Sequence, residues 1–152
     1  MRVKSLLFLI ATIILSSSCN VRQQNNFEYS EGLSSYMQRV HDFSIEKSKN
    51  QILYFLKLNS CEPCVASHLE ILKSVKDKKF NLVLIGTTDQ NLSEIMANQN
   101  ITIFTDLNSE ITKYRTGMGK PMIVHIKNGK IIYQKSFYDS DIEMARSYLI
   151  NN

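Results

Sequence analysis

Hydrophobic and polar residues follow one another in blocks that predict alternating helices and strands. Residues 33–43 carry apolar side chains at helical spacing, which predicts a short amphipathic helix. Residues 52–58 (ILYFLKL) and 80–86 (FNLVLIG) are almost entirely apolar, which is typical of strands covered on both faces of a sheet. Between them the helical spacing returns over residues 65–75, so we expect a strand, a helix and a second strand in succession.

The pattern is weaker in the middle of the chain and strong again near its end. We expect a helix at residues 92–98, a strand at residues 101–105 and a helix at residues 108–115. Two further strands, at residues 122–126 and 131–134, flank an Asn-Gly dipeptide that is typical of tight two-residue turns, so they predict a β-hairpin.

The last predicted element is a helix after the hairpin. Residues 140–143 (SDIE) have the spacing of a capping box, which predicts that this helix begins there. Strands that alternate with helices pair in parallel and are covered on both faces, and a hairpin adds antiparallel strands. The predicted fold class is therefore α/β, with a central mixed β-sheet flanked by helices.

The N-terminus has the three regions of an export signal. Arg2 and Lys4 make a short basic start, residues 6–15 are apolar, and three serines stand directly before Cys19. The apolar run is about half of the ~20 residues that a membrane-spanning helix needs. We expect residues 1–18 to be a signal peptide and the protein to be exported.

Residues 15–19 (LSSSC) resemble a bacterial lipobox, in which the cysteine becomes the lipidated first residue. Leu15 stands four residues before Cys19, whereas the lipobox usually has it three before. The alternatives are an ordinary signal peptide, which leaves Cys19 as a free thiol, and an uncleaved anchor. The expected organisation is a lipidated Cys19 with a polar tether at residues 19–32 and one domain at residues 33–152, anchored in the cell envelope and facing the periplasm or the cell exterior.

The amino-acid composition indicates that a hydrophobic core stabilises this domain. The chain has 152 residues, of which 43% are hydrophobic and only three are cysteines, too few for a disulfide-stapled scaffold. The formal net charge is +4, and removal of Arg2 and Lys4 leaves 16 basic against 14 acidic residues, a net +2. A nucleic-acid partner needs a dense basic face, so we expect none.

A pair of cysteines is the strongest candidate for chemistry. Cys61-Glu62-Pro63-Cys64 lies between a predicted buried strand and the helix that follows it. A cysteine at a helix start faces unpaired backbone N–H groups and the positive end of the helix dipole, which favour the thiolate. Pro63 suits the first turn, and Cys64 lies on the same side of the helix as Cys61. The pair is typical of a redox-active dithiol, which needs no cofactor and no metal because protein sulfur carries the electrons.

A metal site is the alternative interpretation of the same cysteines. Zinc needs two more ligands, there is no second CxxC, and His125 would have to join His68 from a distant strand. A second metal interpretation is a copper-binding lipoprotein that uses Cys61, Cys64 and a histidine, because Cu(I) prefers soft thiolates. In a third alternative the cysteines form a structural disulfide in a non-catalytic lipoprotein. We expect His68 to be partly exposed and His125 to lie at the rim of the core or in solvent.

A proline before the hairpin adds to the redox interpretation. Lys120-Pro121 directly precedes a predicted strand, where a proline, often with a cis peptide bond, is tolerated. CEPC after a buried strand, Asp106 after the third strand, Gly-Lys-Pro and an Asn-Gly hairpin together resemble the thioredoxin fold. More narrowly, they are similar to the TlpA/ResA-like thiol–disulfide oxidoreductases of lipoprotein type, over residues 43–152.

The resemblance implies a role for each residue of the candidate site. Cys61 would be the attacking thiolate, Cys64 the resolving thiol, and Pro121 a cis-proline that packs against the dithiol and aligns the substrate chain. The resemblance also implies a membrane-anchored, extracytoplasmic enzyme that reduces or exchanges disulfides in exported proteins. Its dithiol would be restored by a membrane electron donor of the thiol-reducing type.

Three positions depart from the family pattern. Ser60 replaces the tryptophan that usually precedes the first cysteine, and Ser67 stands where TlpA-like members often carry a carboxylate. Phe55 stands where thioredoxin has a buried acid. The usual proton acceptors for Cys64 are therefore missing from the sequence.

Two charged residues are expected to act on the dithiol in opposite directions. Glu62 places a carboxylate beside Cys61 and opposes the thiolate, whereas an ammonium of Lys120 near the dithiol would support it. Exposed charges at contact distance interact by only ~1 kcal/mol, so either effect is small. The alternative for both side chains is a solvated surface charge.

Overall fold

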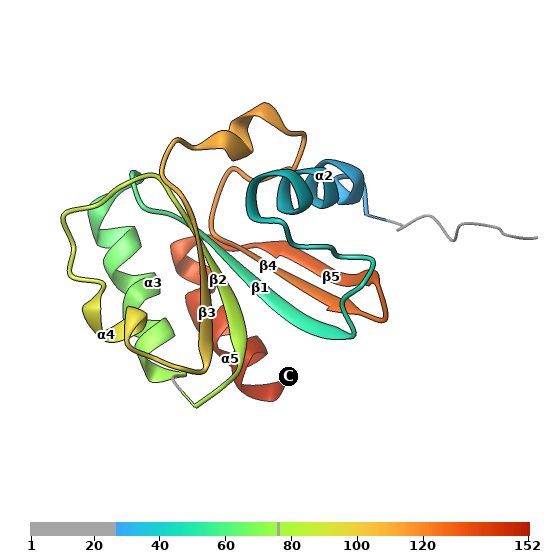
Figure 1. Cartoon of the computed structure of the whole chain (residues 1–152). Coiled ribbons are helices and arrows are strands. Elements are labelled where there is room, and N and C mark those ends of the chain that lie inside the picture. Colours follow the sequence, from blue (N-terminus) through green and yellow to red (C-terminus); the bar gives the residue numbers. More distant parts are fainter. Residues whose placement is uncertain (1–26, 76) are drawn as a thin grey trace, which may run out of the picture.

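The computed structural model describes residues 27–75 and 77–152, and its elements follow the predicted order (Figure 1). The helices are α2 (Ser30–His41), α3 (Glu62–Ser74), α4 (Ser93–Met96) and α5 (Ile142–Asn151), with the 3₁₀ turns η1 (Glu110–Lys113) and η2 (Asp139–Asp141). The strands are β1 (Asn50–Lys57), β2 (Phe80–Ile85), β3 (Ile101–Asp106), β4 (Met122–Lys127) and β5 (Lys130–Ser136).

The predicted signal peptide and Cys19 lie outside the described residues. Within residues 27–75 and 77–152, no helix has the length and apolar character needed to cross a membrane. α2 begins at Ser30 and Phe27 already packs against the core, so the predicted domain boundary at residue 33 falls inside this helix.

The five strands form one mixed sheet in the order β3-β2-β1-β4-β5. β2 pairs in parallel with both β1 and β3, whereas β4 runs antiparallel to both β1 and β5. The parallel part comes from the β1–α3–β2 and β2–α4–β3 crossovers, and the closing hairpin supplies the antiparallel part. The α/β prediction is confirmed, and the arrangement is thioredoxin-like: a central mixed sheet with helices on both faces.

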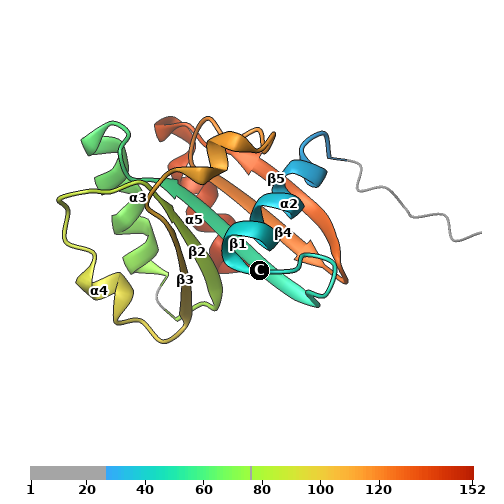
Figure 2. The same cartoon turned by 45° about the horizontal axis from the view of Figure 1, so that its top comes forward.

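Successive residues of the central strands face two separate cores. Tyr54 and Leu56 of β1 belong to the core under α3 and α5, whereas Leu53 and Phe55 belong to the core under α2. Figures 1 and 2 show α2 on one face of the sheet and α3 with α5 on the other. Because both faces are covered, the sequence of β1 is almost continuously apolar instead of alternating.

The weaker predicted helices are shorter than expected. The helix predicted at residues 92–98 is the four-residue α4, and the one predicted at residues 108–115 is η1. Asp106 holds η1, because its buried carboxylate accepts hydrogen bonds from the N–H groups of Glu110 (2.8 Å) and Ile111 (2.9 Å) and from the hydroxyl of Tyr36 (3.0 Å). Asp106 is thus a structural residue.

The predicted capping box at residues 140–143 does not form. Asp141 is the N-cap residue of α5 and makes no side-chain capping bond. The physical reason is that residues 139–141 form η2, whose 3₁₀ turn leads directly into α5 and satisfies part of its first turn through the backbone.

The predicted hairpin is confirmed. Asn128 and Gly129 both have positive φ (51° and 74°), as the two central residues of a type I′ turn require. Their N–H groups donate to the carbonyls of Lys49 (2.7 Å) and Ser48 (2.8 Å), so the turn is tied to the segment before β1. A side chain at Gly129 would place its Cβ 2.5 Å from the carbonyl oxygen of Glu46, so only glycine fits.

Candidate active site

Three strand ends meet at the edge of the sheet where the cysteine pair lies. Cys61 follows the C-terminal end of β1. Met122, at the start of β4, pairs with Phe55 near the end of β1 and with Ser136 at the end of β5. The loop before β4 and the turn after β5 therefore lie at the same edge as the cysteines.

The two cysteines are joined as a disulfide at the start of α3. Their Cα atoms are 5.3 Å apart, and Cys61 is itself the N-cap residue, with its Sγ accepting a hydrogen bond from the Cys64 N–H (3.3 Å). After reduction, the same N–H and the helix dipole would stabilise a thiolate on Cys61. Cys61 is exposed and Cys64 is half-buried, so Cys61 is the more accessible of the two residues.

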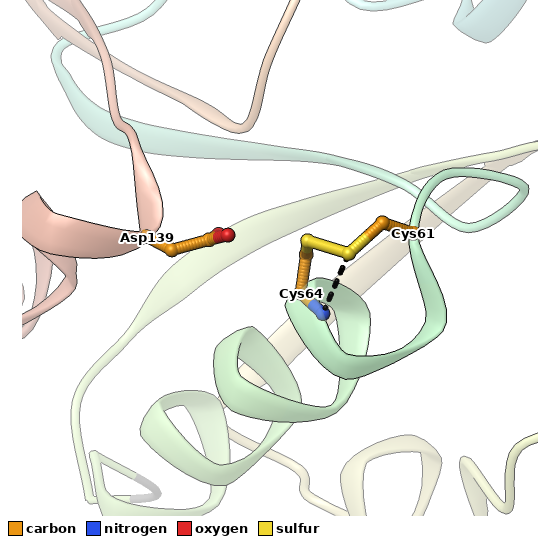
Figure 3. Close-up of side chains that lie close together, drawn as sticks. All are labelled: Cys61, Cys64 and Asp139. Atoms are coloured by element: carbon orange, nitrogen blue, oxygen red, sulfur yellow. Dashed lines mark hydrogen bonds between the residues drawn. A yellow bond between two sulfur atoms is a disulfide. The ribbon is translucent and has the colours of Figure 1, made fainter.

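A carboxylate that the sequence did not indicate completes the cluster. A side-chain oxygen of Asp139 and the two Sγ atoms of Cys61 and Cys64 all lie within 4.8 Å of one another. Figure 3 shows the Asp139 side chain extending from η2 toward the disulfide at the start of α3. The site thus combines a CxxC disulfide with a carboxylate from a distant part of the chain.

The backbone around Asp139 is fixed on both sides. Phe137 is buried, and its N–H donates to the carbonyl of Pro121 (2.8 Å). The N–H of Asp141 donates to the carbonyl of Tyr138 (2.9 Å), which closes η2. These bonds link the turn after β5 to the loop before β4, so the position of Asp139 follows from the hairpin.

Lys120 lies beside this turn, with its ammonium over the Tyr138 ring, 2.8 Å from the ring centroid. This contact is a cation–π interaction with an exposed ring. It brings the positive charge of Lys120 next to the residue that precedes Asp139. The structure therefore places Lys120 at the same edge of the sheet as the dithiol.

The expectation of a cis peptide bond at Pro121 was wrong. All peptide bonds between described residues are trans, including the Lys120–Pro121 bond. The trans isomer is the intrinsically favoured one, and in this form the Pro121 carbonyl accepts the Phe137 N–H that extends the β4–β5 ladder. Pro121 lies directly before β4 and is half-buried.

The middle residues of the CxxC motif belong to the first turn of α3. Glu62 is exposed, and its carbonyl accepts a hydrogen bond from the side-chain amide of Gln90 (3.1 Å). Pro63 lies in the first helical turn, where its missing N–H costs no hydrogen bond, and its carbonyl accepts from the hydroxyl of Ser67 (3.0 Å).

The prediction that His68 is partly exposed was also wrong. His68 is completely buried, because position 68 belongs to the same stripe of α3 as Val65, Leu69 and Leu72, which faces α5 and the sheet. Its Nδ1 shares a hydrogen bond with the hydroxyl of Tyr54, and its Nε2 makes none with the described residues. Burial lowers the pKa of His68, and the charge of Asp139 opposes that shift.

His125 lies away from the cysteines, in a network of its own. It is buried, and its ring nitrogens share hydrogen bonds with the Tyr148 hydroxyl and the Asn50 side-chain oxygen (2.8 Å each). Among the described residues, the group of Cys, His, Asp and Glu side chains close enough to share a metal ion is Cys61, Cys64 and Asp139. The structure thus brings a carboxylate to the pair where the metal interpretation expected a histidine.

No protein-family model and no curated protein matches the sequence. Among solved structures, the chain is similar to the pneumococcal exposed lipoprotein thioredoxin Etrx1 from Streptococcus pneumoniae. The two chains are 17% identical, the match covers 68% of this chain and 87% of that chain, and the TM-score is 0.41. This chain's own geometry combines a central mixed sheet, covered by helices on both faces, with a CxxC disulfide at the start of the first crossover helix.

Proposed function

We propose that this protein is a membrane-anchored, extracytoplasmic thiol–disulfide oxidoreductase of the TlpA/ResA-like type. In this role it reduces or exchanges disulfides in exported proteins. The observation that carries the proposal is the asymmetry of the pair: Cys61 is exposed at the helix N-cap, and Cys64 is half-buried one turn further on. An exposed, thiolate-favouring cysteine next to a shielded one suits a two-step exchange.

The reaction begins with attack of the Cys61 thiolate on a substrate disulfide. A bond forms between Cys61 Sγ and one substrate sulfur, and the other substrate sulfur leaves as a thiolate. The Cys64 sulfur then attacks Cys61 Sγ, which forms the intramolecular disulfide and releases the second substrate sulfur. Two electrons pass from the dithiol to the substrate, and a membrane electron donor of the thiol-reducing type would restore the dithiol.

An insulin-reduction assay with the purified full chain in detergent tests this activity. The wild-type protein should accelerate insulin reduction by a small dithiol, and Cys61→Ser should abolish the acceleration. Cys19→Ser is the matched control, because it also removes one cysteine but should leave the rate unchanged. Absence of catalysis by the wild-type chain, or equal catalysis by Cys61→Ser, would overturn the proposed function.

The anchor is proposed from the sequence, because Cys19 lies outside the described residues. Mass spectrometry of the mature N-terminus should find a lipidated Cys19, and Cys19→Ala should yield a soluble or unprocessed form. An intact Met1, or a mature protein that begins after residue 19, would exclude a lipid anchor at this cysteine.

Copper binding is the second candidate function, and the cluster of Cys61, Cys64 and Asp139 is the observation that bears on it. Two thiolates suit Cu(I), but a carboxylate is a hard ligand that suits other ions better. Titration of the reduced chain with Cu(I) against a competing chelator separates the two functions. Tight stoichiometric binding without insulin reduction would favour copper handling over exchange.

A further inference from the structure

The second step of the exchange needs a thiolate on Cys64, and this residue lacks the features that favour a thiolate on Cys61. Cys64 lies inside α3, is half-buried, and uses its own N–H to bind Cys61 Sγ (3.3 Å). At the two positions where the family resemblance implies an acid, this chain carries Phe55 and Ser67. Some other group must therefore take the proton of the Cys64 thiol if resolution is to be fast near neutral pH.

Asp139 is placed to be that group. Its carboxylate oxygen lies within 4.8 Å of both sulfur atoms, and the side chain makes no hydrogen bond or ion pair with any other residue of the described chain. The neighbouring acids lie differently: Glu143 pairs with Arg146 (3.5 Å), and Asp141 occupies the N-cap position of α5, where its side chain makes no capping bond. The fixed backbone of η2 holds a free carboxylate beside the disulfide.

We infer that Asp139 is the proton acceptor for the Cys64 thiol in the resolving step, an inference that rests on the proposed function. In the mixed disulfide, the Cys64 S–H proton passes to the Asp139 carboxylate. The resulting Cys64 thiolate attacks Cys61 Sγ, the Cys61–Cys64 bond forms, and the bond from Cys61 to the substrate sulfur breaks. The substrate sulfur leaves as a thiolate, and the proton held by Asp139 passes to that thiolate or to solvent, which returns the carboxylate to its ionised form.

Other charged groups surround the cluster and define what a pH profile would report. Glu62 is exposed in the first turn of α3, His68 is buried one turn after Cys64, and Lys120 lies over the Tyr138 ring. Burial keeps His68 from competing for the proton, because the charged imidazolium would lack solvent. Unlike these three residues, Asp139 is an exposed acid without an ion-pair partner among the described residues, and its carboxylate lies within 4.8 Å of both sulfur atoms.

Single-turnover kinetics can observe the two steps separately. The reduced full chain is mixed with one equivalent of dithiobis-nitrobenzoate, which releases one coloured thiolate when Cys61 attacks and a second when Cys64 resolves the mixed disulfide. At about pH 7, Asp139→Asn should leave the first phase within about twofold of wild type and slow the second by about tenfold or more. Asp139→Glu should restore most of the second phase, and Asp141→Asn, which removes the same charge two residues away, should change neither phase.

The pH dependence of the second phase distinguishes proton transfer from a structural role. In Asp139→Asn its rate should rise about tenfold per pH unit below the pKa of a free thiol, whereas the wild-type rate should depend less steeply on pH. A second phase in Asp139→Asn that matches wild type in rate and pH profile would overturn the inference and leave the proposed function intact. A wild-type chain that releases no first thiolate would instead overturn both.

Discussion

Acidification should destabilise the fold through its buried histidines, and His68 allows the effect to be worked out. Its side chain is 0% exposed, the Tyr54 hydroxyl occupies Nδ1, and burial lowers its pKa below the value of about 6.5 expected in the unfolded chain. Below pH 6.5 the unfolded state therefore binds more protons than the folded state. The stability contributed by the neutral imidazole is complete above about pH 6.5 and is lost as the pH falls toward the lower folded pKa.

The magnitude follows from the proton linkage. At about pH 5.5, one unit below the unfolded pKa, a histidine that stays neutral in the folded state lowers the free energy of unfolding by about 1.4 kcal/mol. Burial also lowers the pKa values of His41 and His125, so the three histidines together set an upper limit of about 4 kcal/mol. That loss is large beside the usual stability of about 5–15 kcal/mol for a domain.

Urea unfolding at about pH 7.5 and about pH 5.5 measures this loss, and His68→Gln isolates the share of His68. Glutamine keeps a polar group for Tyr54 but cannot be protonated, so the variant should lose up to about 1.4 kcal/mol less than wild type between the two pH values. At typical urea m-values of about 1–3 kcal/mol/M, this is a difference of up to about 0.5–1.4 M in the shift of the urea midpoint. Equal losses in wild type and His68→Gln would refute the reasoning.

Three further predictions address the site and its support. Iodoacetamide should alkylate Cys61 of the reduced chain much faster than Cys64. Cys64→Ser should accumulate a mixed disulfide with substrate that Cys61→Ser does not form, and equal trapping by both variants would contradict the assigned roles. Lys120→Met should lower the reduction potential by about 10–20 mV and Glu62→Gln should raise it, measured by glutathione equilibration at fixed pH; a shift for Glu62→Gln alone would show that Lys120 does not act on the dithiol. Asp106→Ala should lower the free energy of unfolding in urea by about 2–4 kcal/mol, because it removes the acceptor of three buried or half-buried donors; a change below about 1 kcal/mol would contradict that role.

Much of the fold was predictable because periodicity and turn chemistry are local. The continuous apolar runs of β1 and β2 indicated a covered sheet, and the Asn-Gly turn indicated the hairpin. The burial of His68 was also predictable, because its spacing from Val65 and Leu72 places it in the buried stripe of α3. Whether a histidine is tolerated there depends on Tyr54, a partner on another element that spacing alone does not identify.

The cysteine pair was visible in the sequence, but its acidic neighbour was not. Cys61 and Cys64 are three residues apart, whereas Asp139 joins them only through strand pairing. The hairpin prediction contained part of the signal, since a hairpin returns the end of β5 to the start of β4. Simple pairing outward from the turn would place Met122 opposite Lys135, yet an irregularity beside His125 moves the partner to Ser136. The pattern of hydrophobic and polar residues in the sequence does not indicate this one-residue offset.

The hydrogen-bonded turn of the β4–β5 hairpin lies far from the sulfur atoms, yet it helps to set the position of Asp139 beside them. The turn lies about 17–20 Å along the strands from the edge that carries the cysteines, at about 3.4 Å per residue. Its bonds to Ser48 and Lys49, and the absence of room beside Gly129, hold the register of the whole hairpin. A slip of one residue would move the carboxylate by a strand step and turn Phe137 out of its core. The position of the Asp139 carboxylate beside the cysteines therefore depends on a glycine at the opposite end of the sheet.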